Sequence, residues 1–203
     1  MKLLHIDSSA LGDASTSRRL TAELVAAFRD RGGDIAVTHR DLDKQAPAHL
    51  TGTVLGAQAA EASTLSPEVL ADVRYGNALM AEFLAADVLV IGAPMYNFSI
   101  PTPLKAWIDR IVKAGITFKY DTTGAVGLAT GKRAYIVSSR GGKLADDSAL
   151  DHQESYLRGV LGFIGVTDLT IVRADGLAYG PEAAAASIAT AREAIAREVA
   201  VTA

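Results

Sequence analysis

The chain has 203 residues, which predicts a single domain, residues 1–203, built around one hydrophobic core. Its formal charge is −3 and its Lys and Arg residues are scattered, so no basic stripe is present and nucleic acid is not expected as a partner. The absence of cysteine excludes disulfides, thiolate metal sites and a cysteine nucleophile.

Neither a metal nor a membrane is expected to bind. The sequence contains four histidines: His5, His39, His49 and His152. They are far apart in sequence and form no HxxxH pair, so no metal site is predicted. Asp7 interrupts the apolar N-terminus, so a signal-peptide core is not expected. The most apolar segment, 88–95, is shorter than the roughly 20 residues that cross a bilayer. A cytoplasmic protein is therefore expected.

Short apolar runs alternate with longer helical patterns along the chain, as is typical of parallel strands joined by crossover helices. Five strands are predicted, at residues 3–6, 35–37, 88–91, 134–137 and 169–172. These runs lack polar alternation, as expected of strands that are covered on both faces. We therefore expect an α/β fold with a doubly wound sheet of five parallel strands and helices on both faces.

The helices between these strands are predicted from apolar residues at helical spacing. The first has apolar residues at helical spacing within 20–28 and ends at Gly32 and Gly33. The helix before the third strand begins with Ser66 as its N-cap and includes Leu84 in its buried stripe. Pro181 opens the last helix. The stretch 41–66 has no clear period, and a segment of that length is expected to be functional or partly helical.

Three loops after strands have an unusual composition. In an open parallel sheet, ligands bind beyond the carboxyl ends of the strands, where the strand order reverses. If the order is 2-1-3-4-5, the loops after strands one, three and four meet at one edge. The first loop, 8–17, is rich in Ser and Thr and leads into a helix N-terminus, which favours an anion such as phosphate. Alternatively, these residues only cap the helix. Neither a GxGxxG nor a Walker A motif is present.

The second loop, 92–101, places Met95, Tyr96, Asn97 and Phe98 where a surface loop would normally be polar. Such a cluster can line a flat aromatic ligand, although Met95 and Phe98 could instead be core residues.

The third loop, 138–142, contains Gly141 and Gly142, which serve either an ordinary turn or a close backbone approach to a ligand. Together the three loops predict a phosphate beside a planar ring, as in FMN.

These loops resemble those of the FMN-dependent NADH-azoreductases, a family within the flavodoxin-like superfamily that also contains the NAD(P)H:quinone oxidoreductases. The segments that carry the resemblance are Ser15–Ser17, Ala93–Phe98, Lys113–Tyr120, Ser138–Gly142 and Leu161–Gly165. They span almost the whole chain. The resemblance implies a flavodoxin-like homodimer with its site at the subunit contact and one noncovalent FMN per subunit. It also implies NADH or NADPH as the electron donor and quinones and aromatic azo compounds as acceptors.

The resemblance also assigns roles to individual residues. The phosphate would be held by Ser9, Ser15, Thr16 and Ser17. The isoalloxazine would be flanked by Met95, Tyr96, Asn97 and Phe98. Its pyrimidine end would meet Ser139, Arg140, Gly141 and Gly142. The aromatic wall of the substrate cavity, partly supplied by the partner subunit, would comprise Phe118, Tyr120 and Phe163.

No side chain is expected to be catalytic, because FMN carries the redox chemistry. The expected mechanism is ping-pong: hydride passes from the nicotinamide to FMN, the oxidised nucleotide leaves, and the acceptor takes two electrons at the same face. The alternative is a flavodoxin-type electron carrier without nicotinamide-dependent turnover, although the charge of −3 is mild for such a carrier. A serine hydrolase is disfavoured because no GxSxG motif is present.

Overall fold

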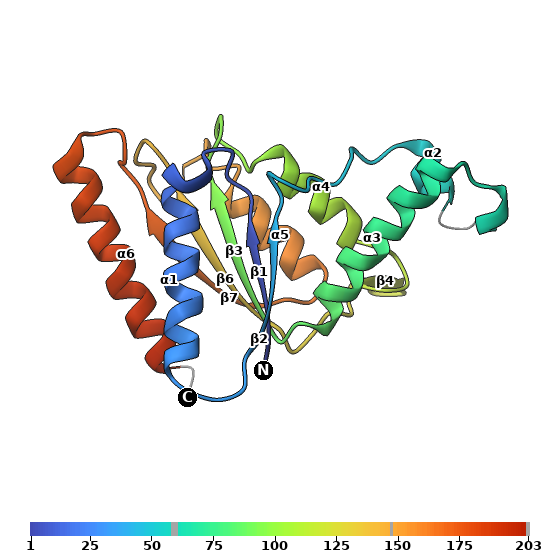
Figure 1. Ribbon diagram of the computed structural model, residues 1–203, viewed down its shortest axis with the longest axis horizontal. Coiled ribbons are helices and arrows are strands. Elements are labelled where there is room, and N and C mark those ends of the chain that lie inside the picture. The colour runs from blue at the N-terminus through green and yellow to red at the C-terminus, as the bar shows by residue number, and fades with distance from the viewer. Residues whose placement is uncertain (58–60, 147, 202–203) are drawn as a thin grey trace.

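The computed structural model describes residues 1–57, 61–146 and 148–201 (Figure 1). Its main sheet has five parallel strands in the order β2-β1-β3-β6-β7. Their bounds are β1 Lys2–Asp7, β2 Ala36–Asp41, β3 Val88–Pro94, β6 Arg133–Ser139 and β7 Asp168–Ala174. Because β6 and β7 are the fourth and fifth strands of this sheet along the chain, the predicted order 2-1-3-4-5 is confirmed.

Helices cover both faces of the sheet (Figure 1). The α-helices are α1 Thr16–Asp30, α2 Gly52–Ala57, α3 Pro67–Ala85, α4 Thr102–Ile111, α5 Glu154–Phe163 and α6 Pro181–Val201. On the central strand β3, Val88 and Val90 pack with α1 and α6, whereas Leu89 and Ile91 pack with α3, α4 and α5. The strand is therefore buried on both faces, which explains its uninterrupted apolar sequence.

The predicted start of α3 is confirmed, but one residue of its buried stripe is wrong. Ser66 is the N-cap, and its side chain accepts a hydrogen bond from the backbone N–H of Val69. The helix buries Leu79 and Phe83, whereas Leu84 is 43% exposed. Successive helical residues are rotated by about 100°, so with Phe83 facing the core, Leu84 turns toward solvent.

The sequence prediction missed a small antiparallel hairpin, formed by β4 Phe118–Asp121 and β5 Gly124–Gly127. Its four-residue strands are mostly exposed and have no core-facing alternation to reveal them. The edge strand β2 is also longer than predicted, because its polar residues pair with β1 without being buried.

The stretch 41–66 contains α2 and the short 3₁₀ helix η2 Ala62–Thr64, so it is partly helical as predicted; a second 3₁₀ helix, η1 Gly12–Ala14, precedes α1. No helix in the described part of the chain combines the length and hydrophobicity that spanning a membrane requires.

Candidate functional site

The three loops singled out in the sequence do meet, at the carboxyl ends of β1, β3 and β6. The backbone N–H of Met95 donates to Ser139 O at 2.7 Å and joins the second loop to the third. The Tyr96 hydroxyl lies 3.1 Å from Ser9 Oγ and accepts from the backbone N–H of Ala10 at 3.1 Å, which joins the second loop to the first. The hydroxyl of Tyr96 therefore belongs to the serine-rich end of the site.

The serine-rich end is built around the N-terminus of α1. Ser15 is the N-cap, and its Oγ accepts a hydrogen bond from the backbone N–H of Arg18 at 3.3 Å. Ser15 Oγ also lies 3.0 Å from Ser17 Oγ, and Ser9, Ser15 and Ser17 are all buried. Hydroxyls gathered at a helix N-terminus form a donor-rich environment that suits an anion.

The mostly buried side chain of Arg18 holds the first loop through the backbone of Ser9. Its guanidinium donates to Ser9 O at 2.8 Å and forms a two-pronged pair with the carboxylate of Asp41, at 2.6 and 2.7 Å. The hydrogen bond from Arg18 outweighs partial burial and lowers the pKa of Asp41 to about 2. Arg18 is therefore occupied inside the protein, where it holds the backbone of Ser9 rather than facing the site.

The second loop contains a tight turn in a strained conformation. Tyr96 N–H donates to Ser99 O at 2.9 Å, and Ser99 N–H donates back to Tyr96 O at 3.1 Å. The two residues between them, Asn97 and Phe98, have φ values of 49° and 71°. Asn tolerates this left-handed region, but Phe rarely adopts it, and such strain concentrates at binding sites. The turn leaves the Phe98 side chain 50% exposed.

In the third loop, Arg140 contributes its backbone rather than its side chain to the edge of the site. Its guanidinium is buried and pairs with Asp151 at 2.9 Å and with Glu154, and it donates to Ser138 Oγ at 3.2 Å. Burial raises the pKa of Asp151, but hydrogen bonds from the Glu154 and Gln153 backbone and from Arg140 outweigh it, so that pKa is lowered. Arg140 therefore positions the backbone of Gly141.

Two adjoining cavities of about 280 and 290 Å³ lie between these loops and share Met95, Arg140 and Gly141. The first is lined by Ser9, Leu11, Ala14, Ser15, Thr16, Pro94, Met95, Tyr96, Ser139, Arg140, Gly141, Leu177 and Ala178. The second is lined by Met95, Asn97, Phe98, Arg140, Gly141, Gly142 and Leu144. The first cavity is hydroxyl-rich at one end. The second is lined by the apolar side chains of Met95, Phe98 and Leu144 together with Asn97 and Arg140, and no carboxylate lines either cavity within the described residues.

This arrangement fits FMN. An anionic phosphate suits the serines at the start of α1, and a flat ring suits the apolar cavity beside Met95 and Phe98. At Gly141 an added Cβ would lie 3.4 Å from Ala178 Cβ, so the protein itself could accommodate a small side chain there. Sequence reasoning missed Leu11, Leu144 and Leu177, whose approach depends on how the loops fold.

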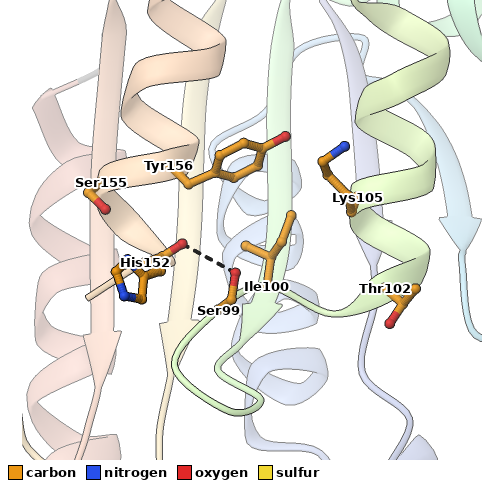
Figure 2. Close-up of a pocket in the computed structure, with 7 residues that line it drawn as sticks. All are labelled: Ser99, Ile100, Thr102, Lys105, His152, Ser155 and Tyr156. Atoms are coloured by element: carbon orange, nitrogen blue, oxygen red, sulfur yellow. Dashed lines mark hydrogen bonds between the residues drawn. The ribbon is translucent and has the colours of Figure 1, made fainter. Parts of the chain in front are cut away.

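A larger cavity, about 640 Å³, lies next to this site between α4 and α5 and was not predicted. Figure 2 shows its lining: Ser99, Ile100, Thr102, Lys105, His152, Ser155 and Tyr156. Two hydrogen bonds connect it to the strained turn, from His152 N–H to Phe98 O at 3.1 Å and from Ser99 Oγ to His152 O at 3.3 Å. Burial is the main cause that raises the pKa of Tyr156, to about 12.

The structure does not bring the three predicted wall aromatics to this edge within one chain. Phe118 and Phe163 pack together with ring centroids 4.6 Å apart, and the ring centroids of Phe118 and Tyr120 are 5.6 Å apart. They lie where the hairpin meets the connection from α5 to β7, through close approach of Gly127 and Gly165. That connection leads into the amino end of β7, whereas the cavities lie at the carboxyl ends of the strands.

A family model described as a flavodoxin-like fold matches residues 1–199 of the chain. The chain therefore belongs to this flavodoxin-like family, in agreement with the observed strand order and with ligand cavities at the carboxyl ends of the strands.

Within this family, the chain is similar to the following proteins. An FMN-dependent NADH:quinone oxidoreductase of Azospirillum brasilense is 54% identical over 199 residues, which covers 96% of each chain. FMN-dependent NADH:quinone oxidoreductase 2 of Pseudomonas aeruginosa is 52% identical over 200 residues, covering 98% of this chain and 99% of the other. The crystal structure of an FMN-dependent NADH-azoreductase from Bacillus anthracis in complex with FMN superimposes with a TM-score of 0.85 and 27% identity, over 98% of this chain and 100% of that one.

Proposed function

We propose that this protein is an FMN-dependent oxidoreductase that transfers electrons from NADH to quinones. The observation that carries the proposal is the pair of adjoining cavities, hydroxyl-rich at the start of α1 and apolar beside Phe98, which match the two halves of FMN. Relatives of about 50% identity over nearly the full length, named for this activity, support it. They favour an enzyme over a flavodoxin-type carrier.

Different residues would bind the phosphate, the ring and the pyrimidine end of FMN. Ser9, Ser15 and Thr16, which line the first cavity, would hold the phosphate together with the first-turn N–H groups of α1. Ser17 does not line the cavity, but its Oγ lies 3.0 Å from Ser15 Oγ and would join this set of hydroxyls. Met95 and the strained turn at 97–98 would border the ring. The backbone of 139–142 would meet the pyrimidine end, held in place by the buried pairs of Arg140.

When bound, FMN would supply the redox chemistry, accepting two electrons from the nicotinamide and passing them to the acceptor. The chain would leave one face of the ring accessible, at the apolar cavity beside Phe98 and Leu144. A single accessible face would require NADH and the acceptor to occupy the cavity in turn. Aromatic azo compounds would be acceptors of the same flat shape, by analogy with the azoreductase of similar fold.

We infer that two copies of the chain form a homodimer that completes the substrate cavity. Tyr120 is 72% exposed and Phe98 is 50% exposed, and the 640 Å³ cavity opens next to Phe98. Because Phe118, Tyr120 and Phe163 lie away from their own chain's site, they would contribute to a substrate cavity only from a partner. Two exposed aromatic residues at separate places on the surface, Phe98 beside the 640 Å³ cavity and Tyr120 on the hairpin, favour such a contact between copies.

Titration of the apoprotein with FMN, followed by NADH oxidation in the presence of a benzoquinone, tests the proposal. We expect saturable binding of one FMN per chain and turnover that depends on both FMN and quinone. Gly141→Val serves as the blocked variant, since Gly141 lines both cavities and an added Cβ there would have only Ala178 Cβ within 4 Å. Full FMN affinity and turnover in Gly141→Val would place the site elsewhere.

A further inference from the structure

A cluster of two histidines and a carboxylate lies on the first two strands, outside the proposed flavin site. His5 on β1 is the register partner of His39 on β2, and Asp7 follows two residues after His5 on the same face (strands labelled in Figure 1). The sequence predicts that no metal binds, because these histidines are 34 positions apart, but parallel pairing places them side by side. Their ring centroids are 4.5 Å apart.

The ligating atoms of the cluster converge. Asp7 Oδ2 lies 3.3 Å from His5 Nε2 and 3.0 Å from His39 Nε2, and all three atoms fall within 4.8 Å of one another. Two ligands bound to one tetrahedral zinc ion at about 2.0–2.1 Å are about 3.3 Å apart. The distance from Asp7 Oδ2 to His5 Nε2 equals this separation, and the distance to His39 Nε2, which is a hydrogen bond in the structure, is slightly shorter.

His5 provides a second, independent indication. The residue is 7% exposed, and its Nε2 is buried without an aligned hydrogen-bond partner in the part of the chain that the structure describes. Its 3.3 Å contact with Asp7 Oδ2 does not have the geometry of a hydrogen bond, and a buried ring nitrogen in that position is unfavourable unless a further group satisfies it. Because this nitrogen belongs to the converging set, a bound cation would satisfy it.

The surroundings of Asp7 hold its carboxylate in position for such a role. Its other oxygen, Oδ1, accepts a hydrogen bond from Thr21 Oγ1 of α1 at 2.8 Å. Gly92 on β3 leaves room for this pair, because an added Cβ would lie 3.0 Å from Asp7 Oδ1 and 3.2 Å from Thr21 Cγ2. Hydrogen bonds of this kind orient carboxylate ligands in metal sites.

We propose that His5, Asp7 and His39 form a zinc site that clamps β1 to β2, with water as the fourth ligand. Two imidazoles and one carboxylate suit Zn²⁺, whereas Mg²⁺ prefers an all-oxygen shell. The His39 side chain is 49% exposed, so the ion and its water have access from solvent at the sheet edge. The site lies directly before the serine-rich loop, and its role is structural, since nothing in the flavin cavities requires it.

Calorimetric titration of FMN-loaded, chelator-treated protein with ZnCl₂ tests the site, with His39→Ala as the variant and His49→Ala as the matched control. His39 is largely exposed, so its loss should leave the fold intact, and His49 is an exposed histidine outside the cluster. We expect one Zn²⁺ per chain for the wild type and for His49→Ala. His39→Ala should lose about 100-fold or more in affinity, since loss of even a residue behind a metal ligand costs about 10- to 100-fold.

Thermal unfolding supplies a second readout. Excess Zn²⁺ should raise the midpoint temperature of unfolding of the wild type and of His49→Ala but not that of His39→Ala, because an ion that binds only the folded state stabilises it. An unchanged zinc affinity in His39→Ala, the absence of saturable heat in the wild type, or equal affinity for Mg²⁺ would each overturn the proposal.

Discussion

Ser17 contributes a buried hydroxyl to the proposed phosphate end, where its Oγ lies 3.0 Å from Ser15 Oγ. We predict that Ser17→Ala weakens FMN binding about tenfold or more, because a hydrogen bond to a charged group contributes roughly 1.5–3 kcal/mol. Fluorescence titration of the apoprotein measures this affinity. Thr190→Ala, which removes an exposed hydroxyl on α6, should bind FMN as tightly as the wild type. Equal affinities for both variants would place the phosphate elsewhere.

Asp41 should make a pH-dependent contribution to stability through Arg18. Its pKa is lowered from 3.8 to about 2 in the folded protein, so the folded state is stabilised above pH 3.8 and loses this stabilisation as the pH falls toward 2. A shift of that size means that the pair contributes on the order of 2 kcal/mol to the free energy of unfolding. We predict that Asp41→Asn unfolds more easily at neutral pH but differs little from the wild type near pH 2.

Denaturant unfolding across this pH range provides the measurement, and Asp43→Asn, at an exposed neighbouring carboxylate, provides the control. A wild type and Asp41→Asn that differ equally at every pH would show that the Arg18 pair does not depend on the charge of Asp41.

At the scale of elements, the turn at 96–99 holds Phe98 in a left-handed conformation, which costs stability but fixes the position of its ring. A left-handed conformation costs a residue with a Cβ roughly 1–2 kcal/mol relative to glycine. We predict that Phe98→Gly unfolds at a higher temperature than Phe98→Ala, because only glycine relieves the strain at φ 71°. Both variants should turn over quinone more slowly than the wild type, since both lose the ring. If Phe98→Ala were the more stable variant, the turn would not be strained.

The sequence predicted the main sheet well because its strands are buried and uninterrupted, and Val88 to Ile91 could not be mistaken for a polar loop. It predicted the three loops of the site because topology alone brings strand ends together. It could not predict how side chains turn at the site. The Tyr96 hydroxyl lies within hydrogen-bond distance of Ser9 Oγ, and Arg140 points inward to acidic partners that come eleven and fourteen residues later.

The missed features share a physical reason. The β4 and β5 hairpin has no buried face, so it lacks a periodic pattern, and Leu84 lies one position beyond a buried stripe that sequence alone places only approximately. The pairing of His5 with His39 depends on strand register, which a single sequence does not specify.

For the whole molecule, the homodimer that we propose would place Phe163 of one copy at the acceptor site of the other. We predict that Phe163→Ala changes the KM for quinone while leaving FMN bound, because the residue lies outside both flavin cavities of its own chain. Light scattering should report a dimer for the wild type at assay concentrations. A catalytically competent monomer would contradict the shared cavity.

The measurement that tests the central proposal most directly is the initial rate of NADH oxidation by FMN-loaded protein, with NADH and quinone varied independently. If one face of the bound ring is accessible, as we propose, turnover should be well above that of free FMN, and double-reciprocal plots should give parallel lines because donor and acceptor would use one cavity in turn. Intersecting lines would show that both substrates bind together. A protein that holds one FMN per chain but oxidises NADH no faster than free FMN would contradict the assignment as an oxidoreductase and leave an electron carrier.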